Sequence, residues 1–369
     1  MIQRLILRHR YSKIYQIEDA WKGRAILVSE KVIVALDAMG GDNAPVEIVK
    51  GAVEAVKEEA GLLVKLVGRE EQVRAELAKY TYPQGQIEVV DAPDVIETGE
   101  QPVMAIRRKK DSSMVRALTM VKEKKADAFV SAGSSGAILV GGQVIVGRIR
   151  GVERPPMAPL IPTAKGVSIL VDSGANVDSR PSFLVQWAKM GYIYMENIMG
   201  IKNPKVAIVN VGLEEEKGNQ LVKETYPLLK ACKDINFIGS IEARNIPNGD
   251  ADVIVCDAFV GNVILKLYEG TAKMLLSKVK TTLMSSLKTK IGALLIKNSL
   301  SDTMKSFDAK QYGGAPLIGL NGLVVKTHGN AKAMEVKNSL LQCVKFQREK
   351  VNEKIIASIS AEKLDEAEA

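Results

Sequence analysis

The chain has 369 residues, of which 46% are hydrophobic and 25% are charged, and its formal net charge at pH 7 is +8. These values are typical of a globular protein with two domains or one large α/β unit, and they exclude collagen-like and wholly disordered chains. The three cysteines, Cys232, Cys256 and Cys343, lie far apart, which argues against a disulfide framework and a thiolate metal site. We therefore expect a protein of a reducing compartment, the cytoplasm.

The positive charge is concentrated in two segments, residues 1–31 and 271–307, which carry net charges of +4 and +6. Only 5% of the residues are aromatic, so side chains that stack on bases are scarce and we expect no nucleic acid partner. No run reaches the ~18 uninterrupted apolar residues of a membrane span. Charges interrupt the start of the chain where a secretory signal would be apolar.

Residues 1–31 lack the patterning of the chain that follows, and we interpret them as an N-terminal leader or remnant rather than a functional arm. The fold is expected to begin with KVIVALDAMGG at 31–41, an apolar run ending in glycines, as buried parallel strands do. Asn43 is then expected to cap a helix, with Pro45 in its first turn.

Similar apolar runs, each ending in glycine or a small polar residue, recur along the chain, and most lead into helical periodicity. They lie at 62–68, 86–93, 126–133, 167–174, 205–212, 235–243 and 251–261. This alternation predicts an α/β fold with a mostly parallel, doubly wound sheet. The chain after about residue 329 reads as helical, so we expect a main unit at 32–350 and a helical tail at 351–369.

Ligands in open α/β sheets bind where strand ends meet helix starts. The first such junction offers Gly40, Gly41 and Asp42. The loop after 126–133 offers glycines and hydroxyls whose backbone N–H groups can converge on an anion, or simply form a serine-capped turn: Ser131, Gly133, Ser134, Ser135 and Gly136. Neither loop has the spacing of a Walker A or GxGxxG motif, so ATP and dinucleotides lack support.

Later junctions add further polar candidates. Lys217 follows three acidic residues and either binds phosphate, polarises a carbonyl or neutralises its neighbours. Asn262, at a helix start after Asp257, is either an oxyanion donor or an N-cap, and Lys266 follows one turn later. Asn176 lies in the loop after 167–174.

Histidine is scarce, because only His9 and His328 occur and His9 lies in the N-terminal extension. A Ser-His-Asp triad would need His328, and no GxSxG elbow supports it. A histidine metal site is equally unsupported, and we expect no metal.

The motifs at these junctions, in their order along the chain, resemble those of the PlsX family of phosphate acyltransferases. They are DAMGGDNAP, SAGSSGA, DSGANVDSRP with QWAKMG, NVGLEEEKGN, VCDAFVGNVILKLYEG and YGGAPLIGLNGLVVKTHG. The resemblance covers about residues 32–350. It departs at Ser135, where threonine is usual, at Ala258, where glycine is usual, and at Ser173, where a small apolar residue is common. It implies a three-layer α/β/α architecture similar to the isocitrate/isopropylmalate dehydrogenases and phosphotransacetylase, and a homodimer.

The resemblance also implies a reaction, transfer of a fatty acyl group from acyl-carrier protein to inorganic phosphate for phospholipid synthesis, with no cofactor. Lys217 and Asn262 match the positions expected to be catalytic, and His328 and the other loop residues above are expected to bind phosphate and substrate. Direct attack by phosphate needs positioning and oxyanion stabilisation, not a Ser-His pair. The alternatives are a phosphotransacetylase-like acyl-CoA enzyme, a dehydrogenase of related fold, or a non-enzymatic basic membrane or nucleic-acid binder.

Residues 271–307 combine lysines with apolar residues that mostly recur at four-residue steps along an interrupted helix pair, including Leu275, Val279, Leu283 and Leu287. A basic amphipathic helix of this kind binds the surface of anionic bilayers. A core-facing or dimer-facing helix is the alternative. The family resemblance implies a membrane-bound glycerol-phosphate acyltransferase downstream, so we expect peripheral membrane association.

Overall fold

The computed structural model describes residues 31–306 and 309–368, and the chain from Val32 onward forms one compact unit. The predicted N-terminal extension, with His9, lies outside the described residues except for Lys31. Two sheets make up the unit, with strand orders β10-β11-β4-β1-β2-β3 and β5-β6-β9-β7-β8. Each sheet is parallel apart from one antiparallel edge strand, β10 or β5. The predicted α/β fold class is confirmed.

All eight strands expected from the sequence are present, and the structure adds the short strands β5, β10 and β11. In the first sheet the strands are β1 (Val32–Asp37), β2 (Leu62–Gly68), β3 (Ile87–Asp91), β4 (Ala128–Ser131), β10 (Ala315–Leu317) and β11 (Leu323–Lys326). In the second they are β5 (Leu160–Thr163), β6 (Gly166–Val171), β7 (Lys205–Val209), β8 (Asn236–Ile241) and β9 (Val253–Val255).

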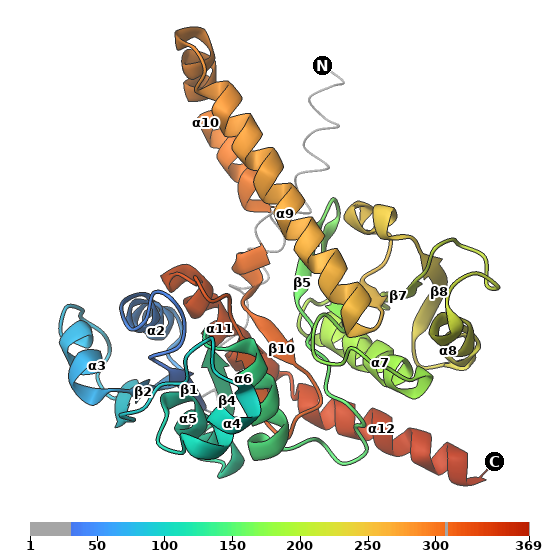
Figure 1. Ribbon diagram of the computed structural model, residues 1–369, viewed down its shortest axis with the longest axis horizontal. Helices are drawn as coiled ribbons and strands as arrows, with labels where there is room; N and C mark the ends of the chain where they lie inside the picture. The colour runs from blue at the N-terminus through green and yellow to red at the C-terminus, as the bar shows by residue number, and fades with distance from the viewer. Residues whose placement is uncertain (1–30, 307–308, 369) are drawn as a thin grey trace. The chain divides into compact units, whose positions relative to one another are not determined.

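Helices cover both faces of each sheet, which gives the three-layer architecture (Figure 1). The first sheet lies between α2 and α11 on one face and α4, α5 and α6 on the other. Helices α7 and α8 cover one face of the second sheet, with α12 packed on α7, and η2 and the start of α9 cover the other face. Their bounds are α2 (Val46–Glu58), α3 (Glu70–Leu77), α4 (Pro102–Arg108), α5 (Ser113–Lys122), α6 (Ser135–Gly141), η1 (Gly142–Val146), α7 (Pro181–Asn197), α8 (Gln220–Ala231), η2 (Ala243–Asn248), α9 (Ala258–Leu283), α10 (Leu287–Ser306), η3 (Ala309–Tyr312), α11 (Ala333–Arg348) and α12 (Val351–Glu368).

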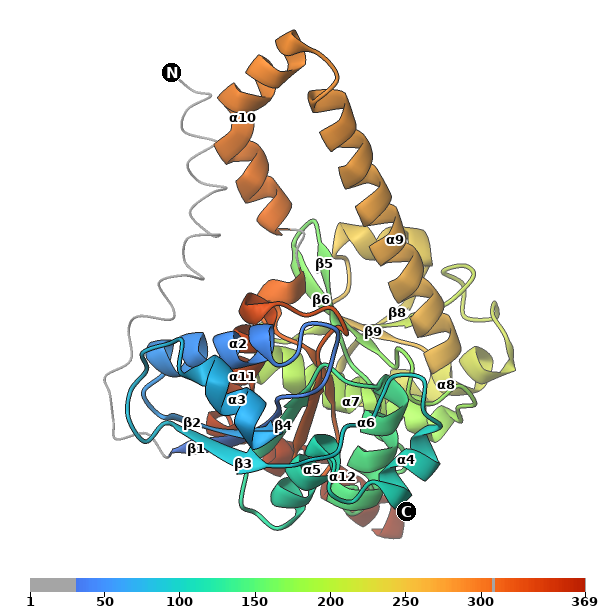
Figure 2. The ribbon, with the colours of Figure 1, turned by 60° about the vertical axis from the view of Figure 1, so that its left-hand side comes forward.

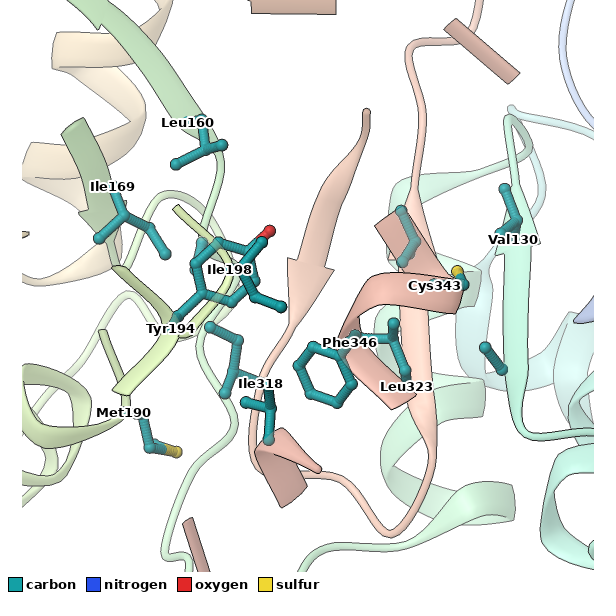
Figure 3. Packing of buried hydrophobic residues seen from close by; sticks show 14 of the residues in the cluster. Val130, Leu160, Ile169, Met190, Tyr194, Ile198, Ile318, Leu323, Cys343 and Phe346 are labelled. Atoms are coloured by element: carbon teal, nitrogen blue, oxygen red, sulfur yellow. The ribbon is translucent and has the colours of Figure 1, made fainter. Parts of the chain in front are cut away.

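One hydrophobic cluster joins the two sheets. Figure 3 shows Val130 of β4 on one side, Ile169 of β6 on the other, and Tyr194 and Phe346 between them. The buried Tyr194 hydroxyl accepts a hydrogen bond from Gln342 Nε2 at 2.7 Å, which ties α7 to α11. This shared core fixes the strand ends of the two sheets relative to each other.

The expected cap of the first helix is wrong. Helix α2 begins after Pro45 and has no side-chain cap. Asn43 Nδ2 instead donates hydrogen bonds to the carbonyl oxygens of Asn330 and Ala331, both at 3.1 Å. The asparagine thus joins α2 to the segment before α11, a partner that local sequence does not reveal.

Helices α9 and α10 form a hairpin whose far end extends beyond the sheets (Figures 1 and 2). The helix pair breaks at 284–286, within the segment expected to contain an interrupted pair. Among the described residues, every helix is too short or too polar to cross a bilayer. The tail is also helical, and the first turns of α12 pack into the core through Val351, Ile355 and Ile359.

Candidate active site

The ends of β1 and β4 form a packed polar cluster. The buried Asp37 carboxylate accepts a hydrogen bond from Ser131 Oγ at 2.7 Å, and Ser131 Oγ accepts one from the Gly133 N–H at 2.9 Å. Burial raises the pKa of the Asp37 carboxyl, and hydrogen bonds from Ser113 and Ser131 oppose that shift. A Cβ on Gly40 would lie 2.6 Å from Asp37 Oδ2, so glycine is required. Three predicted site residues, Gly40, Ser131 and Gly133, meet here. The Gly133 N–H already donates to Ser131 Oγ and is therefore not available to an anion.

Gly41 and Asp42 connect this cluster to the end of β11. Gly41 has a φ of +92°, and a Cβ there would lie 2.7 Å from the Gly329 carbonyl oxygen. The Asp42 N–H donates to the same oxygen at 2.7 Å. The loop after β1 and the loop after β11 are therefore held in contact through their backbones.

The residues that start α6 have separate roles. Ser134 Oγ accepts a hydrogen bond from the Ala137 N–H and caps the helix. Gly136 packs against Pro102, whose Cγ would lie 2.6 Å from an added Cβ. Ser135 is exposed and is the residue of this loop that lines a nearby cavity.

That cavity, of about 150 Å³, lies among the ends of β10 and β11, the strand β5 and the helix α9. Three predicted residues from distant parts of the chain, Ser135, Lys266 and His328, line it. Glu269 lies between two of them, with its carboxylate 3.1 Å from Lys266 Nζ and 4.0 Å from His328 Nε2. No group of three or more His, Cys, Asp or Glu side chains in the described part of the chain is arranged to hold a metal.

Most residues of this cavity were not predicted from the sequence, among them Lys326, Thr327 and Glu335. Burial lowers the pKa of Lys326 to about 8, with a further contribution from the neighbouring Lys266, while Glu335 opposes the shift. Glu335 Oε1 accepts the His328 N–H at 2.8 Å. The sequence does contain a signal for these residues. The polar segment KTHG follows the apolar run LVV, just as polar residues follow the other strands, but LVV is too short to be recognised as a strand.

At the ends of β6 and β9 two predicted residues organise the backbone. Asp172 accepts hydrogen bonds at 2.8 Å from both the N–H and Nδ2 of Asn176, and that amide also donates to the Pro155 carbonyl oxygen at 3.0 Å. Burial raises the pKa of the Asp172 carboxyl. Asp257 caps α9 by accepting the Val260 N–H at 3.0 Å. Asn176 and Asp257, the two predicted residues, thus hold the loops that precede α9.

Asn262 is exposed in the second turn of α9. It does not cap the helix, because Asp257 does. It precedes Lys266 by four residues, so the two side chains lie on one face of α9, the face that lines the cavity. A Cβ on Gly261 would lie 1.8 Å from the Asp172 carbonyl oxygen, so the start of α9 is pressed against the end of β6.

Lys217 lies in the loop after β7, where its Nζ is 2.8 Å from Glu214 Oε2 and both side chains are about half exposed. The hydrogen bond with Glu214 raises the pKa of Lys217. Asn210 Nδ2 holds the loop by donating to the Lys217 carbonyl oxygen at 3.1 Å. A second, more apolar cavity of about 260 Å³ lies beside this loop and reaches Asp257. Lys217 and Asn262 line neither cavity.

The residues predicted for a membrane surface lie on the α9–α10 hairpin. Leu275, Val279 and Leu287 are exposed, and Leu283, the last residue of α9, is half-buried. The chain turns at 284–286, so these residues are divided between two helices, as the expected interrupted pair requires.

The comparisons with known proteins agree with the motifs. Residues 32–354 match the family described as Fatty acid synthesis protein. The phosphate acyltransferase of Alkaliphilus oremlandii is 51% identical over 337 residues, covering 91% of this chain and 99% of its own. That of Clostridium botulinum is 50% identical over 323 residues, covering 87% and 97%. The chain belongs to this family. It is an acyltransferase of the PlsX type, as the motifs predicted.

Solved structures confirm the fold. The EutD phosphotransacetylase from Staphylococcus aureus has a TM-score of 0.56 at 16% identity, over 85% of this chain and 94% of its own. A phosphotransacetylase from Streptococcus pyogenes has a TM-score of 0.55 at 18% identity, over 88% and 95%. At these identities the likeness concerns the fold alone.

Proposed function

We propose that the protein transfers a fatty acyl group from acyl-carrier protein to inorganic phosphate and releases an acyl phosphate for phospholipid synthesis. The observation that carries the proposal is the cavity at the strand ends, which Ser135, Lys266 and His328 line. The names of the related phosphate acyltransferases support the same reaction.

The reaction requires little covalent chemistry from the protein. An oxygen of hydrogen phosphate attacks the carbonyl carbon of the thioester, a C–O bond forms, and the C–S bond breaks. The departing sulfur takes up the proton that the phosphate gives up, so the products are an acyl phosphate and a thiol. The protein has to hold phosphate beside the carbonyl, exclude water and stabilise the oxyanion.

Within this proposal Asn262 donates a hydrogen bond to the oxyanion, and Lys217 provides positive charge. The position of Asn262 on the same face of α9 as Lys266 supports its role. Lys217 exchanges its contact with Glu214 for one with the substrate. The free-energy cost of breaking the Glu214 contact is small, because the pair is exposed. No cofactor takes part in these steps.

The second candidate is a phosphotransacetylase that uses acyl-coenzyme A, favoured by the fold of the solved neighbours. The test compares acyl phosphate formation from phosphate with acyl-carrier protein and with acyl-coenzyme A that carry the same acyl chain. We expect the carrier-protein donor to react faster. A reversed preference supports the phosphotransacetylase, and no acyl phosphate from either donor contradicts the proposed function.

We further propose that the α9–α10 hairpin binds anionic membranes from the cytoplasm, close to a membrane-bound glycerol-phosphate acyltransferase that consumes the labile product. Exposed apolar residues beside lysines support this, with Leu287 and Leu295 80% and 82% exposed. The double variant Leu287→Glu/Leu295→Glu should lose co-sedimentation with phosphatidylglycerol vesicles. The control Val144→Glu, exposed on η1, should not. Equal sedimentation of all three proteins contradicts the assignment.

A homodimer is also proposed, on the family resemblance. Sedimentation velocity of the wild type and of the hairpin double variant tests it. A monomeric wild type contradicts the dimer. A dimer that the double variant alone loses assigns the hairpin to subunit contact and not to the membrane.

A further inference from the structure

Two buried side-chain oxygens among the described residues have no hydrogen-bond partner, Thr327 Oγ1 and Glu335 Oε2. Both residues are only 2% exposed, and both line the cavity at the end of β11. A buried polar atom without a partner is costly, so a water, an ion or a ligand is expected to supply the missing hydrogen bonds.

Two lysines face the same cavity. Lys326 extends from the end of β11 and Lys266 from α9, and Lys266 is close enough to help lower the pKa of Lys326. Lys266 is paired with Glu269 at 3.1 Å, so the charge available to an anion is that of the partly buried Lys326. The unpaired oxygen of Glu335 would repel an anion that consists of acceptors only, so the ligand must also carry a hydrogen-bond donor.

We propose that Lys326, Thr327 and Glu335 form the subsite for hydrogen phosphate: Lys326 binds a phosphate oxygen, Thr327 donates its hydroxyl to another, and Glu335 Oε2 accepts the P–OH. This inference rests on the proposed function and adds to it the residues that select phosphate. One ligand satisfies both unpaired oxygens and a lysine.

The proposed subsite also explains how phosphate can bind near the loop at 131–136, where it was expected, although groups of that loop are already hydrogen-bonded. In that loop the Gly133 N–H is engaged by Ser131, and the Ser134 hydroxyl caps α6. Lys326 is the register partner of Ser131 in the β11–β4 pair, so the proposed subsite lies directly beside the predicted one. A cavity of about 150 Å³ is smaller than sites for drug-sized ligands and suits a small ion.

Sulfate is the decisive probe, because it resembles phosphate in shape and charge but has no O–H to donate at neutral pH. We expect isothermal titration calorimetry at pH 7 to show that the wild type binds inorganic phosphate about tenfold or more tightly than sulfate. No acyl donor is needed, so the result does not depend on whether the acyl transfer itself is correctly assigned.

Isosteric variants identify the residues. Glu335→Gln places an amide donor opposite the anion and should lose the preference for phosphate over sulfate by about tenfold. Thr327→Val should weaken both anions similarly, because either can accept from the hydroxyl. The matched control is Glu76→Gln, which alters a buried glutamate of α3 paired with Lys79 and Tyr80 far from the cavity.

Three results would overturn the proposal: wild-type protein that binds sulfate as tightly as phosphate, wild-type protein that binds neither anion, or an unchanged preference in folded Glu335→Gln. Because two of these use the wild type alone, a variant that fails to fold leaves the test intact. Acyl transfer without the predicted anion preference would refute the subsite and leave the proposed function standing.

Discussion

Two strand ends of this protein each present a lysine beside a glutamate, and their environments differ. After β7, Lys217 and Glu214 form a contact at 2.8 Å with both side chains about half exposed. At the end of β11, Lys326 and Glu335 lie in a cavity, and burial lowers the pKa of Lys326. An exposed pair contributes little to stability and can exchange partners, whereas charged groups that line a cavity are held in place for a ligand. The chemistry of a lysine therefore depends on its burial as much as on its motif.

The largest effect is expected at the two residues proposed to be catalytic, Lys217 in the exposed loop and Asn262 on α9. Lys217→Ala and Asn262→Ala should each lower kcat by ~10²-fold or more, as removal of an oxyanion donor does. The measurement is steady-state acyl phosphate formation, with circular dichroism to verify the fold. The control is Lys230→Ala, which removes another exposed lysine that pairs with a glutamate, Glu215, at 2.5 Å.

If Lys217→Ala and Lys230→Ala are both as active as the wild type, the loop after β7 is not part of the catalytic site. Lys326 would then be the lysine of the two strand ends that remains a candidate for substrate binding.

The buried lysine should affect phosphate binding. Lys326→Gln should weaken phosphate by about tenfold or more at pH 7, as loss of a hydrogen bond from a charged group does. Lys326 is faced by Lys266, Glu335 and Asp42. Since its pKa is about 8, it is protonated below that pH and neutral above it, so wild-type affinity should fall as the pH rises through about 8.

Calorimetry with phosphate from pH 7 to pH 9 measures this fall. Lys326→Gln has no ammonium proton to lose, so its affinity should fall less than that of the wild type, while the ionisation of phosphate itself affects both proteins equally. An equal pH dependence in the two proteins would assign the titration to another group.

A pair of glycines tests the difference in packing. A Cβ on Gly314 would lie 2.6 Å from the Lys326 carbonyl oxygen, which is backbone and cannot yield, so Gly314→Ala should lower the free energy of unfolding by about 1–3 kcal/mol. A Cβ on Gly212 would meet the ends of the Lys217 and Glu214 side chains at 2.6 and 2.7 Å. These can move, so Gly212→Ala should change stability by less than about 0.5 kcal/mol. Urea denaturation measures both, and equal losses would show that the two strand ends are packed alike.

The smallest effect is expected for the histidine at the end of β11. His328 binds Glu335 through its backbone N–H, which His328→Ala retains, so kcat should fall less than tenfold. A larger fall in a variant with wild-type thermal stability would give the imidazole a part in the chemistry.

The sequence determined the strands whose apolar runs are long enough to be recognised. It also indicated the junctions, because glycines and small polar residues follow those runs. The strands that it missed, β5, β10 and β11, have three or four residues each, and Pro162 and Pro316 interrupt β5 and β10. Such short segments become strands by pairing with distant partners, as β11 pairs with β4.

The tertiary structure decided which of the junction residues are buried together. Local sequence predicted Asn43 as a cap, but its amide binds carbonyl oxygens 287 and 288 residues away. Motifs indicated Lys217, while Lys326 was passed over, because burial and the pKa shift that follows depend on α9, α11 and β10 closing around it. The sequence determines which chemical groups lie at a strand end. The packing of distant elements determines how far those groups are buried and which partners they contact, and therefore their pKa values.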